Sequence, residues 1–185
     1  AGFSVTTTAG SLTAINVTAT GAVALTANGG AITATNISTS SGDLSLTAGN
    51  GNLLATTINN TSAHTTLTVN AGGDLTANGV TSTGNVTLLN TSGAGFGDIN
   101  VTGDIASSNM VLTITSGIAA GAAVTIDNGV TGTAGSSVNI NSQALVLTGN
   151  ASATANSGNL SVQGNAVGNA LTVSMGNGSS LNATG

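Results

Sequence analysis

The chain has 185 residues, and Thr, Gly, Ala, Asn and Ser account for 132 of them. It has five Asp and one His but no Lys, Arg, Glu, Cys, Pro, Trp or Tyr, and its formal net charge is −5 at pH 7. A chain without cations cannot neutralise nucleic-acid phosphates or hold acidic lipid headgroups by charge, which excludes both as partners. A chain without Cys forms no disulfide and carries out no thiolate chemistry.

The composition favours an all-β fold. Leu, Val, Ile and Phe together make 43 residues, just above the level at which disorder is the default expectation. Thr, Ser, Asn and Gly are poor helix formers, and no apolar run approaches the roughly 20 residues that cross a membrane, so we expect no membrane insertion. The chain begins at Ala1 and ends at Gly185 within its pattern, so we expect a mature fragment or a piece of a longer protein.

A repeat of about 21 residues runs through the chain, and such a period is typical of solenoids. One frame reads apolar-Thr-Ala-x-Asn-apolar at 12–17, 32–37, 53–58 and 75–80, with a weaker fifth copy at 96–101. Alternating apolar pairs precede these copies and stay in phase with them. The pairs are Phe3/Val5, Val23/Leu25, Leu44/Leu46, Leu67/Val69 and Val86/Leu88.

The alternation with period two predicts strands with one buried face. We expect Leu44, Leu46, Leu53, Leu67, Leu75 and Val86 to point inward and Ser45, Thr68 and Thr87 to point outward. The Ala14, Ala34, Ala55 and Ala77 column is expected to fill a narrow interior.

Gly and Asn between the apolar segments predict turns. Gly-Gly at 29–30, Gly-Asn at 49–50 and Gly-Gly at 72–73 are turn signals, because these residues tolerate positive φ. The column of Asn16, Asn36, Gly79 and Asn100 fits a left-handed corner. Thr57 stands in the same column and is a poor left-handed residue, so we expect a local change there.

Three short strands per period, without helices between them, predict a single β-solenoid over residues 1–185. Regular coils are expected over 1–105 and looser coils over 106–185, with longer loops around 117–121 and 148–156. The terminal segments 1–8 and 171–185 contain no helical pattern that would cap the solenoid. Because uncapped strand edges pair with other chains, we expect further coils to continue the stack end to end.

Three segments carry a family resemblance: Gly-Asp-Leu-Ser-Leu-Thr-Ala-Gly at 42–49, Ala-Gly-Gly-Asp-Leu at 71–75 and Gly-Asn-Val-Thr-Leu at 84–88. They resemble the repeats of filamentous-haemagglutinin-like adhesins, which Gram-negative bacteria secrete through two-partner systems. The resemblance covers residues 1–105 well and the remainder loosely. It implies a right-handed parallel β-helix at the cell surface that works in adhesion or biofilm formation.

Carboxylates are the first candidates for chemistry, because parallel β-helices also host polysaccharide lyases and hydrolases that need clustered acids. Four of the five Asp follow Gly and precede Leu or Ile, which is typical of turn residues that bond their own backbone. Asp98 and Asp104 are the only close pair, and they could meet across a loop. We expect no catalytic residue and no enzymatic activity.

His64 is the only His, and no Cys is present to join it in a zinc site. We expect it in an exposed loop. The Gly-rich segment 93–98 is only weakly similar to calcium-binding nonapeptides, because its Gly spacing is wrong and no tandem copy follows. We expect no metal and no cofactor. Eleven Asn-x-Ser/Thr sequons leave glycosylation open.

One surface feature supports a rival hypothesis. Hydroxyl residues recur two positions apart after the third apolar segment of each period, and on stacked coils they would form two parallel files that could order water and bind ice. Thr is also simply favoured at exposed strand positions. The candidate hydroxyl array is Thr18, Thr20, Ser38, Ser40, Thr61, Thr81, Thr83 and Thr102, with Asn59 and Asp104 interrupting it.

These patterns favour a structural and adhesive role: a segment of a secreted extracellular fibre, filament or matrix at the cell surface. Further coils of the same or of identical chains are the expected partners, with cell-surface glycans or host receptors as candidate ligands. The alternative is an ice-binding or carbohydrate-binding face on the solenoid.

Overall fold

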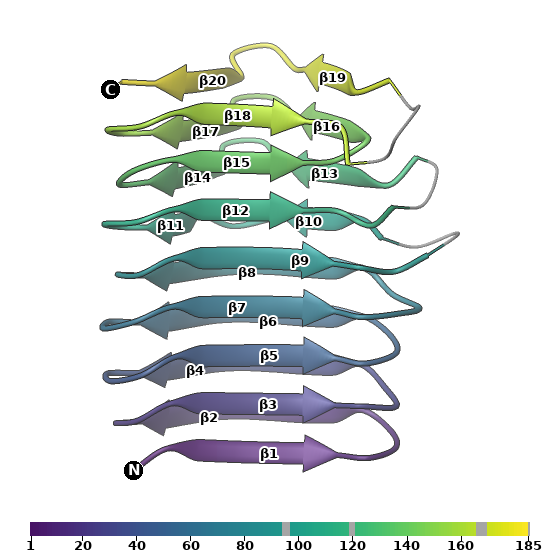
Figure 1. Ribbon diagram of the computed structural model, residues 1–185, viewed down its shortest axis with the longest axis vertical. Helices are drawn as coiled ribbons and strands as arrows, with labels where there is room; N and C mark the ends of the chain where they lie inside the picture. The colour runs from purple at the N-terminus through teal and green to yellow at the C-terminus, as the bar shows by residue number, and fades with distance from the viewer. Residues whose placement is uncertain (94–96, 119–120, 166–169, 185) are drawn as a thin grey trace.

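The computed structural model describes residues 1–93, 97–118, 121–165 and 170–184. Within these ranges all regular secondary structure consists of β-strands, and neighbouring strands pair in parallel. The strands stack into a β-solenoid of about seven turns, each of about 21 residues. The chain runs along the front strands, returns behind them and rises at each turn, which is a right-handed coil (Figure 1).

The first side of the solenoid is an eight-stranded sheet. One strand from each coil contributes to it, and its order follows the chain (Figure 1). Its strands are β1 (Phe3–Thr7), β3 (Val23–Ala27), β5 (Leu44–Ala48), β7 (Thr65–Val69), β9 (Val86–Asn90), β12 (Leu112–Thr115), β15 (Val138–Asn141) and β18 (Leu160–Gln163).

The other two sides belong to a twelve-stranded sheet. Its first four strands have eight residues each and are bent: β2 (Leu12–Ala19), β4 (Ile32–Thr39), β6 (Leu53–Asn60) and β8 (Leu75–Ser82). Later coils divide the same path into β10 (Ile99–Val101) and β11 (Ile105–Ser107), β13 (Ala123–Ile126) and β14 (Thr131–Ala134), β16 (Ala144–Leu147) and β17 (Ser152–Ala155), and β19 (Thr172–Met175) and β20 (Ser180–Ala183).

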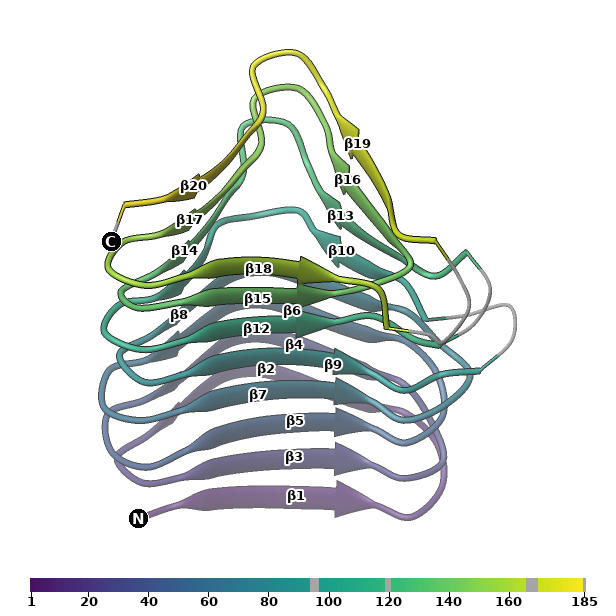
Figure 2. The same cartoon turned by 45° about the horizontal axis from the view of Figure 1, so that its top comes forward.

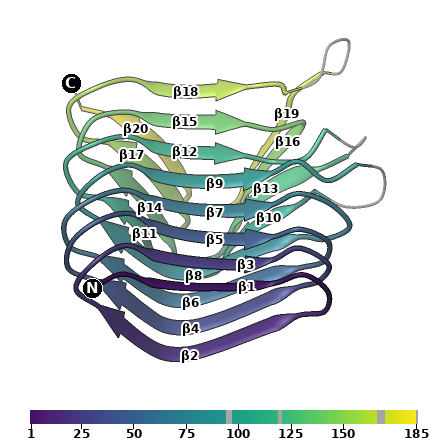
Figure 3. The same ribbon diagram turned by 60° about the horizontal axis from the view of Figure 1, so that its bottom comes forward.

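A left-handed residue bends each eight-residue strand in its middle, so the strand forms a V when seen from the N-terminal end (Figure 3). Asn16 has φ 58°, Asn36 has φ 56° and Gly79 has φ 78°, which confirms the predicted corner. Thr57 keeps the same conformation, with φ 57°. The expected local change at this residue is therefore wrong, because the paired strands on both sides hold its backbone in the bend.

The bend opens into a wider corner after β8. This strand pairs with β10 through Leu75–Ala77 and with β11 through Val80–Ser82, so the two arms of one bent strand support two separate strands. The corner loops are then 102–104, 127–130, 148–151 and 176–179, and the apex rises toward the C-terminal coils (Figure 2). Three strands are expected in each coil. The second and third are one continuous strand in β2, β4, β6 and β8, and they are two separate strands from β10 onward.

The structure differs from the expected pattern at Asn100 and within residues 148–156. Asn100 lies within β10 opposite Thr76 and is not a corner residue, because the fifth copy of the frame is displaced by three residues and Ile99, not Phe96, pairs with Leu75. Phe96 lies outside the described residues. The expected loop at 148–156 contains the strand β17, whose small alternating side chains fit beside β14.

The register of β7 also differs from the apolar pattern. Leu67 pairs with Leu46, and Thr65 occupies the inward position opposite Leu44. The 21-residue offset between β5 and β7 therefore places a hydroxyl in the core, whereas the apolar pattern alone aligned Leu67 with Leu44. Hydrogen-bond register outweighed the match of apolar residues.

The core fills the interior of the coil from end to end. The six residues predicted to point inward are all fully buried, whereas Ser45, Thr68 and Thr87 are half-exposed on the outer surface. The predicted alanine column is also buried, with Ala34, Ala55 and Ala77 at 0% exposure. The alternation therefore identified the core face correctly over the first five coils.

The turns between the two sheets bring consecutive coils into backbone contact. A Cβ atom added to Gly73 would meet the carbonyl group of Gly51 and the backbone nitrogen of Asn52 in the coil below. Only Gly fits at such a position. The predicted Gly turn signals thus serve close stacking of the backbone as well as the turn itself.

Both end coils leave inward-facing side chains uncovered. Phe3 is 39% exposed in β1, and Val173 and Met175 are 44% and 47% exposed in β19. Their register partners one coil inward, Val23, Leu145 and Leu147, are buried. The described residues contain no helix long and apolar enough to cross a membrane.

Candidate functional site: a polar groove along the bend

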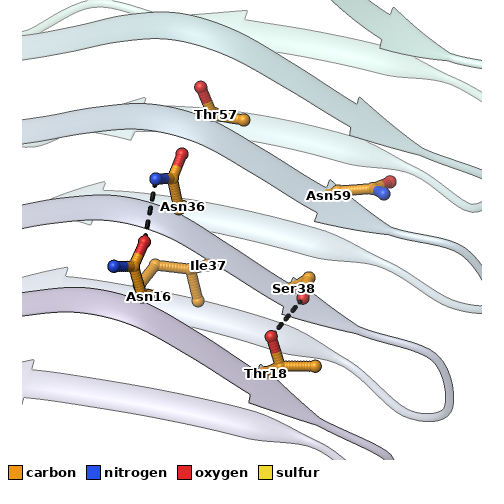
Figure 4. Close-up of a pocket in the computed structure, with 7 residues that line it drawn as sticks. All are labelled: Asn16, Thr18, Asn36, Ile37, Ser38, Thr57 and Asn59. Atoms are coloured by element: carbon orange, nitrogen blue, oxygen red, sulfur yellow. Dashed lines mark hydrogen bonds between the residues drawn. The ribbon is translucent and has the colours of Figure 1, made fainter.

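A groove of about 270 Å³ follows the bend of the first three coils of the twelve-stranded sheet (Figure 4). In each coil the left-handed residue and the residue two positions after it face outward, so consecutive coils add equivalent polar groups to the same groove. It is lined by Asn16, Thr18, Asn36, Ile37, Ser38, Thr57 and Asn59. No ionisable group is among them, so the groove suits a neutral polar ligand.

Hydrogen bonds between coils organise the groove. Asn36 Nδ2 donates to Asn16 Oδ1 at 2.9 Å, and Ser38 Oγ donates to Thr18 Oγ1 at 3.2 Å (Figure 4). The other amide atoms of Asn16 and Asn36 face outward on exposed side chains. Paired amide and hydroxyl groups of this kind present both donors and acceptors to a ligand such as a sugar.

Thr57 occupies the third coil of the groove in a strained conformation. A β-branched residue at positive φ is an outlier of the backbone map, and the left-handed form costs an L-residue about 1 to 2 kcal/mol. Thr57 is exposed, so its side chain interrupts the ladder of amides that Asn16 and Asn36 begin.

The candidate hydroxyl array is only partly assembled by the fold. Thr18, Ser38 and Thr81 do form one file with Asn59, each residue opposite the next in paired strands. Ala106 follows Thr81 in this file. Thr102 instead donates its backbone N–H to Ala77 and lies in the corner, so its expected place in the array is wrong because the wider corner begins before it.

The second file lies in the turn after the bent strands. Thr20, Ser40 and Thr61 are exposed there, and the backbone N–H groups of Ser40 and Thr61 bond to the coil below. Thr83 follows them, but its hydroxyl is buried and has no hydrogen-bond partner. Because the residues of this file lie just beyond the ends of the bent strands, the two files do not share one flat strand surface.

Hydroxyl groups of the first file bond mainly to each other. Thr81 Oγ1 donates to Asn59 Oδ1 at 3.3 Å, in the same way that Ser38 donates to Thr18. Such internal bonds leave fewer groups for a regular layer of bound water.

Each acidic residue that could have formed a catalytic pair instead bonds the next coil. Asp98 Oδ1 accepts the backbone N–H of Ala123 at 2.8 Å, and Asp104 Oδ1 accepts both the N–H and the hydroxyl of Thr131 at 2.8 Å. These bonds join consecutive coils, so the prediction that the Gly-Asp residues bond their own backbone within a turn is wrong for Asp98 and Asp104. Among the described residues, no three His, Asp or Glu gather as a metal site.

His64 is exposed in a turn, as predicted, and lines a shallow hollow with Asp43 and Ser62. Three features remove it from a catalytic triad. Its Nδ1 accepts the backbone N–H of Asn85 at 2.9 Å, so Nδ1 has no N–H to donate to Asp43, as the His of a catalytic triad does. Asp43 Oδ1 accepts the backbone N–H of His64, and Ser62 Oγ accepts the N–H of Gly42.

Sequence reasoning missed two buried asparagines that build the turns. Asn60 is 1% exposed; its Nδ2 donates to Gly42 and His64 carbonyls, and its Oδ1 accepts from the N–H groups of Ser62 and Ala63. Asn90 is equally buried and repeats the motif. The shared tripeptide Asn-Thr-Ser was the available signal. These two sequons are turn caps whose amides are already bonded.

No family model, no curated protein and no solved structure matches this chain.

Proposed function

We propose that the chain is a structural and adhesive segment of an extracellular fibre, filament or matrix at a cell surface. The observation that supports this most directly is the unbroken parallel stack whose first and last coils leave apolar, inward-facing side chains uncovered. Unpaired strand edges of this kind are templates for further strands. More coils of the same chain, or of identical chains, cover both ends in the assembled fibre.

The resemblance of residues 42–49, 71–75 and 84–88 to filamentous-haemagglutinin-like repeats supports the extracellular setting. A rod without Lys or Arg has no trypsin cleavage site, which suits a protein exposed to proteases. Cell-surface glycans or host receptors are the ligands in this proposal, and no enzymatic step is part of it.

The bend groove favours carbohydrate binding as a second candidate function. Its amide and hydroxyl groups, free of charge, match the alternating donors and acceptors of a neutral glycan. Asn36→Ala removes one amide of the ladder without touching the core, because Asn36 is exposed. Loss of binding to a glycan array, with Asn78→Ala on the same sheet as the control, would support this function. Glycan binding that Asn36→Ala leaves unchanged, or no detectable glycan binding by the unmodified chain, would contradict this function.

The fibre proposal is tested by association of the 185-residue chain in solution. Sedimentation across a concentration series should give species that grow end to end. Met175→Asp should reduce this association, because it places a charge at the uncovered end where the next coil stacks. Met110→Asp is the matched control, since Met110 is 48% exposed in a lateral turn and Met175 is 47% exposed at the end.

Two outcomes would contradict the proposal. One is a strictly monomeric, folded chain at high concentration. The other is association that Met110→Asp weakens as much as Met175→Asp, because that result places the contact on the side of the rod.

A further inference from the structure

The outer face of the eight-stranded sheet carries two straight files of side chains that the expected array did not include. Every strand contributes one residue to each file, and the parallel register continues without a bulge from β1 to β18 (Figure 1). The first file is Ser4, Ala24, Ser45, Thr66, Thr87, Thr113, Asn139 and Ser161, and the second is Thr6, Thr26, Thr47, Thr68, Leu89, Thr115, Asn141 and Gln163.

Hydroxyl groups dominate the first six strands of this face. Ten of the twelve outward positions on β1, β3, β5, β7, β9 and β12 are Ser or Thr, and the exceptions are Ala24 and Leu89. Adjacent strands repeat at about 4.8 Å, and alternate residues along a strand repeat at about 6.7 Å. The result is a two-dimensional lattice of hydroxyls on one flat sheet.

Among the described residues, nine of these ten hydroxyl groups make no hydrogen bond to another protein atom, unlike those beside the bend, and the tenth, Thr115 Oγ1, accepts one from Asn141 Nδ2 at 3.3 Å. In the described part of the chain, the side-chain oxygens of Thr26, Thr47, Thr66 and Thr68 bond no other protein atom. By contrast, Ser38 donates to Thr18 on the bend face. Nearly all the hydroxyl groups of the lattice are therefore available to bond whatever lies against it.

The lattice is also rigid. Thr has a β-branched side chain with few χ1 choices, and the residues beneath, such as Leu46, Leu67 and Leu88, are fully buried. A preorganised surface loses little conformational entropy when it binds an equally ordered partner. Many weak contacts can then add together, although a single hydroxyl gains little by exchanging water for another partner.

The side-chain chemistry of the face indicates which kind of ordered partner it can bind. Its strands contain no ionisable residue and no aromatic residue apart from Phe3, which belongs to the inward pattern. Without charged groups it does not select an ionic ligand. Its hydroxyls can both donate and accept, as water molecules do.

We propose that this face binds ice, with its hydroxyl lattice holding a layer of water that continues the lattice of the crystal surface. Oxygen atoms on ice surfaces repeat on the same scale as the lattice of hydroxyls. Water bridges are enthalpically nearly equal to direct hydrogen bonds, so an ordered water layer can join the crystal without loss. This activity uses a different surface from the fibre ends and from the bend groove.

Leu89 interrupts the lattice between Thr68 and Thr115, so substitution of this residue tests the proposal. Leu89→Thr should increase thermal hysteresis and inhibition of ice recrystallisation by the 185-residue chain. Thr68→Tyr should abolish both, because a large side chain in the centre holds the face away from the ice. Thr13→Tyr, at an exposed position of β2 outside the bend groove, is the matched control and should leave both unchanged.

Circular dichroism and thermal unfolding establish that each variant is folded before its activity is compared. Absence of thermal hysteresis in the unmodified chain overturns the proposal. So does activity that Thr68→Tyr leaves intact or that Thr13→Tyr removes. Binding to crystalline cellulose or chitin that Thr68→Tyr abolishes, without any ice activity, would assign the face to polysaccharide instead. None of these results depends on end-to-end association, which Met175→Asp measures separately.

Discussion

Thr57 and Gly79 occupy the same position in consecutive coils, and both have positive φ, 57° and 78° respectively. Val80 pairs with Ile58 directly after them, so the two strands bend together. Gly adopts this conformation freely, whereas Thr adopts it at a cost. The stacked fold thus imposes on Thr57 a backbone conformation that its own side chain disfavours.

Replacing Thr57 by Asn is expected to stabilise the protein by about 1 kcal/mol, because Asn tolerates the left-handed region better. The new amide also extends the ladder formed by Asn16 and Asn36. Urea unfolding measures the change in the free energy of unfolding. Thr56→Asn, one residue earlier in the same strand, is the control and should give no gain. A destabilised Thr57→Asn variant would show that strain at this bend is relieved in some other way.

The buried hydroxyl of Thr65 is expected to lower the free energy of unfolding relative to an apolar side chain of the same shape. This hydroxyl is fully buried without a hydrogen-bond partner, between Leu44 and Val86 in the paired strands. A buried unpartnered hydroxyl costs about 1 to 3 kcal/mol, so Thr65→Val, which keeps the shape, should raise the free energy of unfolding by about 1 to 2 kcal/mol. Thr66→Val on the outer face should be close to neutral. Equal effects of the two substitutions would rule out the buried hydroxyl as the cause.

Asn60→Asp is expected to destabilise the protein by about 3 kcal/mol at neutral pH, because a buried carboxylate would face two carbonyl oxygens to which the amide now donates. Those oxygens and burial raise the pKa of the introduced carboxyl above its value in the unfolded chain. The deficit should therefore grow as pH rises through that range and shrink in acid. Thermal unfolding at several pH values measures this, with the exposed neighbour Asn59→Asp as control. A deficit independent of pH would contradict the assignment.

Leu46→Ala should cost about 2 to 5 kcal/mol, because Leu46 is fully buried and the closely stacked coils cannot collapse into the cavity. Ser45→Ala, the adjacent outward residue, should change stability by less than about 0.5 kcal/mol. Denaturant unfolding of both variants tests the inward and outward assignment of β5. A larger loss for Ser45→Ala than for Leu46→Ala is the result that this assignment cannot accommodate.

Much of the fold could be predicted because the strands and turns of each coil depend on residues that are close together in the sequence. Alternation at Leu44, Ser45 and Leu46 identified the buried face, since neighbouring side chains of a strand must point to opposite sides. The left-handed corner at Asn16 and Asn36 followed from residue types that tolerate positive φ. The hydroxyl array was predicted less well, because β2 ends at Ala19 and leaves Thr20 beyond the strand, and residue spacing does not reveal where a strand ends.

The sequence by itself determined the all-β class, the coil of about 21 residues and the identity of most core residues, because short-range periodicity and turn chemistry act within one coil. Only the tertiary structure decided the register between coils. Hydrogen bonding along the whole ladder placed Thr65 in the core, moved Thr102 to a corner and kept Thr57 in a left-handed bend. The same register aligned Thr26, Thr47 and Thr68 on one flat face, since a lattice exists only when separate coils are stacked in phase.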